Sequence, residues 1–283
     1  MNTSNKLLFV AVLAAAFSAV PVKADIFTTC GVDLGAAGRT KSWAVFTLLM
    51  DSKGKKPDGK NEFHGSAKVL GDIGASGSGN VQLSGNAMIK GDIYSHQPGK
   101  VEKTDKGRLM GSVIQNDATD ALLDQGSEDA LNASLFAAGL PTSPQFSDLK
   151  EINLKDHQQM TIVGDGCTVL SLRNFKLSGD SVLTLTGTAG TAFVINVKDS
   201  FKLTGNSQIV LSGGLTPADV LFNVLHTGGK AELSGKAMGV GILLAARREV
   251  KLTGSSMWTG EVIANKVHVH GKIIGAISPT TNQ

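Results

Sequence analysis

The chain has 283 residues, including 27 Lys or Arg, 24 Asp or Glu and 34 Gly, and only 5% of its residues are aromatic. This nearly balanced charge gives no support for nucleic-acid binding or for electrostatic attachment to a membrane, both of which need strongly basic surfaces. The length suits a single large domain.

The N-terminus has the pattern of a secretory signal peptide. Lys6 precedes an uncharged apolar run from Leu7 to Val20, and the small residue Ala24 provides a cleavage site. The run is shorter than the roughly 20 residues that a membrane-spanning helix needs, and no later run approaches that length. We therefore expect a protein that is secreted or at the cell surface, the periplasm included, with no transmembrane segment after cleavage.

Two cysteines, Cys30 and Cys167, lie beyond the predicted cleavage site. In an oxidising compartment they could form one disulfide that ties the N-terminal segment to the rest of the domain. They could equally remain two separate buried thiols, because a sequence does not give the Cα separation that a bridge requires.

One five-residue phrase recurs along the chain: apolar, polar, Leu, Ser or Thr, Gly. Such recurrence predicts stacked coils of short strands. The Gly suits the corner of each coil, the Leu points inward, and the Ser or Thr hydrogen-bonds to the corner backbone. The copies are residues 81–85, 175–179, 201–205, 231–235 and 250–254, with a degenerate copy at 267–271.

Residues 113–139 interrupt this pattern with apolar residues at helical spacing, and Gly139 followed by Pro141 is a stop signal. We expect one amphipathic helix that packs its Leu and Phe stripe on the strands, with a kink at Gly126 as one option. The apolar residues are Ala118, Ala121, Leu122, Leu131, Leu135 and Phe136.

These patterns predict a mostly β fold, an irregular β-solenoid with one long amphipathic helix packed alongside. The predicted organisation is a signal peptide at 1–24, an N-terminal lead-in and capping segment at 25–65, a solenoid domain at 66–276 with the helix at about 113–139, and a polar tail at 277–283. Unpaired coil ends would allow self-association with another copy.

Several strand segments resemble two families, the bacterial choice-of-anchor A surface domain and the ice-binding proteins. Gly71-Asp72-Ile73-Gly74 and the helix at 113–139 are similar to features of the second family, whose fold is a discontinuous β-solenoid with a flanking long helix. The resemblance covers roughly residues 70–275 and implies that fold. The segments are 192–197, 202–207, 210–214, 220–224, 241–245, 250–254 and 260–264.

Ice binding requires a flat and weakly charged face, and the repeated phrase predicts a charged one. In each copy of the phrase the position before the Leu, or before Val269 in the degenerate copy, holds a long polar or charged side chain. Thr184 and Thr186 form one Thr-x-Thr pair, and no stacked series of such pairs is evident. The expected function is therefore non-enzymatic adhesion or extracellular structure, binding a matrix protein, a glycan or ice, with ice binding as the alternative. The polar column is Gln82, Lys176, Lys202, Glu232, Lys251 and His268.

A polysaccharide-active enzyme is the second alternative, and it lacks a defensible site. Such chemistry needs paired carboxylates or a metal-bound acidic cluster, and the acidic residues of the repeats form neither. His268 and His270 share one strand face, but no third metal ligand is evident. We predict no catalytic residue, no cofactor, no metal site and no enzyme activity, and the binding face stays unassigned. The acidic residues are Asp180, Asp219, Glu232, Glu249 and Glu261.

Overall fold

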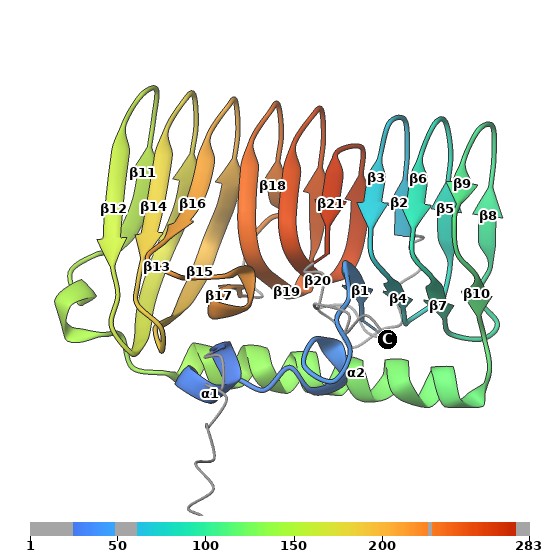
Figure 1. Cartoon of the computed structure of the whole chain (residues 1–283), viewed down its shortest axis with the longest axis horizontal. Coiled ribbons are helices and arrows are strands. Elements are labelled where there is room, and N and C mark those ends of the chain that lie inside the picture. Colours follow the sequence, from blue (N-terminus) through green and yellow to red (C-terminus); the bar gives the residue numbers. More distant parts are fainter. Residues whose placement is uncertain (1–24, 49–60, 226–227, 276–283) are drawn as a thin grey trace, which may run out of the picture.

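The structure, a computed structural model, describes residues 25–48, 61–225 and 228–275. The predicted signal peptide and polar tail therefore lie outside the described residues. The fold is mostly β with one long helix, as predicted. The 21 strands of the described residues form one connected sheet, and all of its strand pairs are parallel. The sheet winds around the molecule in a row of coils, with a helix along its length (Figure 1).

Successive coils stack strand on strand and create three faces, which we call the helix face, the charged face and the third face. The helix face contains β17 (Val220–Val224), β1 (Val45–Thr47), β4 (Ile73–Ala75), β7 (Ile93–Ser95) and β10 (Val113–Ile114). The charged face contains β11 (Glu151–Leu154), β18 (Ala231–Leu233), β2 (Asn61–Phe63), β5 (Val81–Leu83) and β8 (Val101–Lys103). The third face contains β12 (Gln159–Val163), β14 (Val182–Thr186), β16 (Gln208–Ser212), β21 (Lys272–Ile274), β3 (Lys68–Leu70), β6 (Met88–Lys90) and β9 (Arg108–Leu109).

Four long strands bend around the corners between faces. Strands β13 (Cys167–Leu177) and β15 (Ala192–Leu203) run from the helix face into the charged face. Strands β19 (Met238–Leu252) and β20 (Met257–Val269) pass through all three faces. Each long strand therefore fixes the orientation of one face relative to the next.

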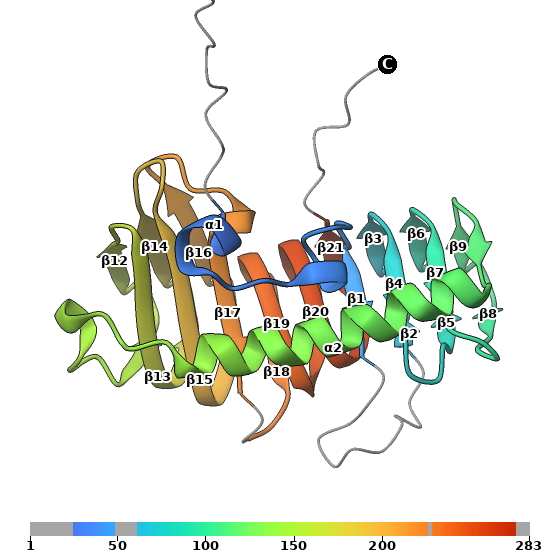
Figure 2. The same cartoon turned by 90° about the horizontal axis from the view of Figure 1, so that it is seen from below.

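The chain does not follow the row of coils from one end to the other. Strands β2 to β10 build one section, helix α2 (Asp117–Gly139) runs back along the molecule, and β11 to β21 build the second section (Figure 2). The last coil then meets the first coil, where β20 pairs with β2 and β21 pairs with β3. On the helix face, β1 lies between β20 and β4. We call this meeting of the two sections the junction.

The repeated phrase forms the corners as predicted. Its Leu side chains are buried and stack in register, as Leu177, Leu203 and Leu233 do. Its glycines adopt left-handed backbone angles, with φ of +67° at Gly179 and +72° at Gly205, which glycine accepts without strain. The Leu of each phrase thus joins inward residues from all three faces, such as Leu172 and Leu185, in one core.

Helix α2 starts at Asp117, four residues after the predicted start, because the Asn116 side chain accepts a hydrogen bond from the Thr119 N–H and caps the helix. The prediction that the Leu and Phe stripe packs on the strands is wrong in part. Leu135 and Phe136 are 64% and 51% exposed. The buried side of the helix instead consists mainly of small residues, namely Gly126, Ser127, Ala130, Ala133 and Ala137.

The lead-in segment covers the helix face beside α2. Helix α1 (Ile26–Cys30) packs near β13 and β15, and a disulfide joins Cys30 to Cys167 with Cα atoms 5.0 Å apart. The coils begin at Asn61 rather than at the predicted residue 66, because Asn61 already pairs with Val81 of the next coil. The described residues also form three short 3₁₀ helices, η1 (Gly35–Ala37), η2 (Pro144–Phe146) and η3 (Pro217–Asp219).

Candidate functional site

The charged face presents the polar column predicted from the repeated phrase. Its outward residues lie in register from β11 through to β8, and Lys202 forms a 3.1 Å ion pair with Glu232. Such a face holds its hydration shell strongly, because moving an ionised group out of water has a high cost in free energy. The column is Asn153, Lys176, Lys202, Glu232, Lys251, His268, Glu62, Gln82 and Glu102.

Over five successive coils the third face differs from the charged face in the charge of its outward side chains. The outward side chains of β12, β14 and β16, and of the starts of β19 and β20, are all partly or fully exposed. Of these thirteen described residues none is charged. We call them the uncharged patch: Gln159, Thr161, Val163, Val182, Thr184, Thr186, Gln208, Val210, Ser212, Met238, Val240, Met257 and Thr259.

The uncharged patch places hydroxyl and methyl groups in rows across the strands. Thr161 lies opposite Thr184, which lies opposite Val210. Thr186 lies opposite Ser212 in the next row. Neighbouring strands are about 4.8 Å apart and outward residues on one strand about 6.7 Å apart, so the side chains form a regular two-dimensional array.

This array has a rigid base. The inward side chains of Leu183, Leu185 and Trp258 beneath it are completely buried, and those of Met160 and Leu211 are partly buried. Val and Thr are branched at Cβ and have few rotamers, so the outward side chains are also restricted. Parallel strands on both sides hold each middle strand of the patch by backbone hydrogen bonds, so the patch is a preformed surface.

Positive charges mark the limit of the patch on the third face. Lys272 of β21 follows Met257 in register, and Lys68 of β3 follows Lys272. Lys90 and Arg108 extend the basic region to the far end. The uncharged patch therefore belongs to the second section of the chain, before the junction.

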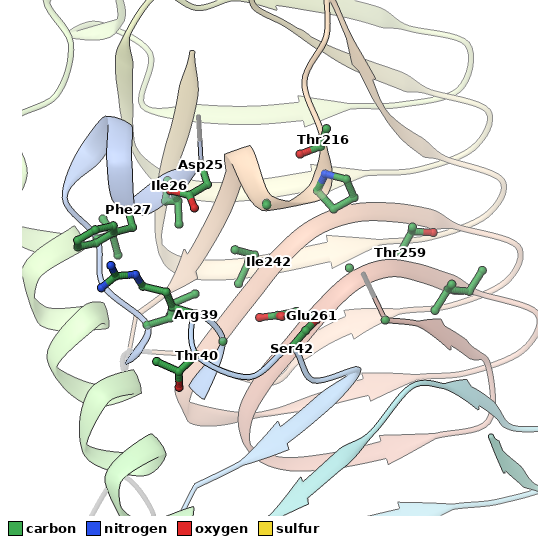
Figure 3. A pocket seen from close by; sticks show the side chains of 18 residues that line it. Asp25, Ile26, Phe27, Arg39, Thr40, Ser42, Thr216, Ile242, Thr259 and Glu261 are labelled. Carbon is green, nitrogen blue, oxygen red and sulfur yellow. Dashed lines mark hydrogen bonds between the residues drawn. The ribbon is translucent and has the colours of Figure 1, made fainter. Parts of the chain in front are cut away.

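A pocket of about 680 Å³ lies between the lead-in segment, η3 and strand β20 (Figure 3). Glu261 points into this region and is 5% exposed. Ser42 Oγ donates to Glu261 Oε1 at 3.1 Å, while Oε2 has no hydrogen-bond partner in the described chain. Burial raises the pKa of Glu261 to about 8. A neutral carboxyl group is therefore expected here at neutral pH.

The structure does not bring together the acidic residues considered for catalysis. Glu232 pairs with Lys202, Glu249 pairs with Lys230 at 2.9 Å, and Asp180 lies 3.6 Å from His157. Asp219 caps η3 by accepting from the Thr216 N–H and hydroxyl. Each of these carboxylates has a local structural partner.

His268 and His270 do share one side of a strand, as predicted. The structure adds Glu62 and His64 next to them, two ligand-type residues that the sequence analysis missed. They were missed because β2 lies some 200 positions earlier in the chain and pairs with β20 at the junction.

The sequence model of the family described as ice-binding-like matches residues 62–274. The chain belongs to the ice-binding-like family. A glycosylated ice-binding protein from an Arctic yeast has a similar structure, with a TM-score of 0.56 and 18% identity over 89% of this chain and 97% of the other.

An ice-binding protein from the Antarctic ascomycete Antarctomyces psychrotrophicus has a TM-score of 0.50 and 15% identity over 87% of this chain and 99% of the other. At these identities the likeness shows a shared fold. No match was found among the curated proteins.

Membership of the ice-binding-like family corrects the expectation of an adhesive or structural protein. That expectation was drawn from the charged column, and the column occupies one face only. The inference from one face to the whole molecule was wrong, because a three-sided coil can carry charges on one side and an uncharged surface on another. In this ice-binding-like protein the charged column and the uncharged patch lie on different faces.

Proposed function

We propose that this ice-binding-like protein binds ice through the uncharged patch. The observation that supports the proposal is the separation of charge: five successive coils that carry part of the charged column on one face present thirteen uncharged side chains on the next. Family membership points to the same ligand.

A crystal of ice offers ordered water and no ions. The protein surface that binds it must therefore give up its own hydration water at a low cost in free energy. Methyl groups of Val and Thr have weakly held water, whereas a charged side chain must be desolvated at a high cost in free energy. Hydroxyl groups of Thr and Ser can hydrogen-bond with water of the lattice. A rigid array of both groups binds with little loss of side-chain entropy.

Further features support this role. The path of the coils, in which the helix returns the chain to the opposite end before the second section begins, supports a discontinuous β-solenoid. In the described part of the chain no helix is both long and apolar enough to cross a membrane. The Cys30–Cys167 disulfide favours an oxidising compartment, and an exported protein would meet ice outside the cell.

Val210 lies in the middle position of the middle strand of the patch and is 38% exposed. Changing Val210→Lys places a hydrated charge at the centre of the proposed surface. We expect thermal hysteresis to fall on the order of tenfold, because the added charge would have to be desolvated at the ice surface.

Gln82→Lys is the matched control, because it adds the same charge to the outward column of the charged face. It should leave hysteresis unchanged. Equal losses in the two variants, or a loss in Gln82→Lys alone, would refute the assignment of the uncharged patch. Circular dichroism of both variants checks that the coils remain folded.

A further inference from the structure

A cluster of imidazole and carboxylate groups lies on the charged face at the junction, well apart from the uncharged patch. Glu62 belongs to β2 in the first coil, and His64 follows that strand. His268 belongs to β20 in the last coil, directly opposite Glu62 in register. The cluster therefore bridges the two sections of the chain.

The ligand-type atoms of Glu62, His64 and His268 all lie within 4.8 Å of one another. His268 Nδ1 is 2.8 Å from Glu62 Oε2, and His64 Nε2 is 3.8 Å from the same oxygen. In a tetrahedral zinc site with bonds of about 2.0–2.1 Å, neighbouring ligand atoms are about 3.4 Å apart. Small movements of these side chains would reach that geometry.

Both histidines have a partner on the ring nitrogen that faces away from Glu62. His64 Nδ1 hydrogen-bonds with the Ser84 hydroxyl. His268 Nε2 lies 3.0 Å from His270 Nε2. Metal-bound histidines commonly use the second nitrogen in this way, and the contact fixes the ring orientation.

His270 is suited to accept the hydrogen bond from His268. Its Nε2 lies 3.0 Å from Nε2 of His268. A neutral ring has one nitrogen free to accept. When a metal replaces the proton on His268 Nδ1, the remaining proton on Nε2 can point to His270.

We propose that Glu62, His64 and His268 bind a divalent transition-metal ion of the zinc type and thereby fasten the first coil to the last. Two imidazole nitrogens and one carboxylate oxygen suit Zn²⁺, with the fourth position left for water. The three side chains are 23–26% exposed, so an ion can enter from solvent. Lys266 Nζ, 3.7 Å from Glu62 Oε2, would move aside into solvent as the ion binds.

The test is calorimetric titration of the tag-free full chain with ZnCl₂ after removal of metals with EDTA. We expect one Zn²⁺ per chain and a higher melting temperature with the ion bound, because a ligand of the folded state alone stabilises it. Absence of stoichiometric binding by the unaltered chain would overturn the proposal.

Variants locate the site. His268→Ala should lose binding, and His157→Ala should retain it, because the side chain of His157 is 86% exposed and lies on a different coil. Binding by His268→Ala equal to that of the unaltered chain would overturn the proposal. Should His268→Ala fail to fold by circular dichroism, His64→Ala replaces it with the same expectation.

A second readout checks the positioning role of His270. His270→Phe should weaken Zn²⁺ affinity by about 10- to 100-fold while leaving the stoichiometry at one. With Co²⁺ in place of Zn²⁺, the unaltered chain should show the strong visible absorption of a tetrahedral site. A weak octahedral spectrum would contradict the proposed ligand set.

Discussion

Glu261 stands out at the residue scale, because its carboxyl group is buried beneath the lead-in segment with a pKa raised to about 8. The folded state therefore keeps a proton that the unfolded chain loses at its ordinary carboxyl pKa, near 4.5. Between these two values the folded state binds more protons than the unfolded state, so the stability from this group falls as pH rises. Below about pH 4.5 and above about pH 8 its contribution is constant.

Glu261→Gln should remove this pH dependence. In the unaltered protein the group lowers the free energy of unfolding by up to about 1.4 kcal/mol per pH unit across that window. The free energy of unfolding of the variant, relative to that of the unaltered protein, should therefore increase as pH rises from about 5 to about 8. Urea denaturation at several pH values measures the difference, and a difference that does not change with pH would contradict the assigned burial of the charge.

The uncharged patch could have been found from the sequence with a fixed offset. Val182, Gln208, Met238 and Met257 each lie three residues after the Gly of the preceding phrase, and the next outward positions follow in steps of two. The residue before each Leu of the phrase, from which the polar column was predicted, selects the charged face instead. The register between neighbouring coils decides which side chains lie next to each other, and the sequence of one repeat does not show this register.

Helix α2 shows at the element scale how small residues set a packing distance. A Cβ atom at Gly126 would lie 2.6 Å from Phe46 Cζ, too close for the helix to keep its position. Phe46 of β1 is completely buried against this part of the helix. The close approach therefore depends on the absence of a side chain at Gly126.

Gly126→Ala should destabilise the fold by about 1–3 kcal/mol, because overpacking outweighs the gain in helix propensity. Gly139→Ala is the control, since no atom lies within 4 Å of its added Cβ. That variant should be neutral or slightly stabilising. Chemical denaturation measures both, and a stable Gly126→Ala variant would show that the helix can move away without cost.

The existence and end of this helix could be predicted from its period and from Gly139 with Pro141. Its buried side could not, because the apolar stripe drew attention to Leu135 and Phe136, which remain exposed. Ala, Ser and Gly give a weak hydrophobic signal, and only tertiary packing selects them here. The helical pattern thus gave the right element and only part of its contacts, since Leu122 and Leu131 do pack on the core.

At the scale of the whole molecule, the interrupted path brings distant segments together. Strand β2 pairs with β20, and β1 pairs with both β20 and β4. The repeated phrase predicts coils but carries no information on their spatial order. For that reason the junction, with Glu62 and His64 beside His268, could not be predicted from the sequence.

The same arrangement separates two kinds of surface on one rigid body. The charged face stays hydrated by solvent. The third face of the second section presents the uncharged patch, which is the surface that we propose contacts ice. The inward Leu column and the parallel strand pairing hold both surfaces fixed. The proposed ice binding therefore needs no movement of the backbone.

The most direct test of this account is the growth of single ice crystals in a solution of the purified protein, with lysozyme as the control. The account predicts faceted crystals and a measurable gap between melting and freezing temperatures. Round crystals that grow freely, as they do with lysozyme, would contradict ice binding by this protein.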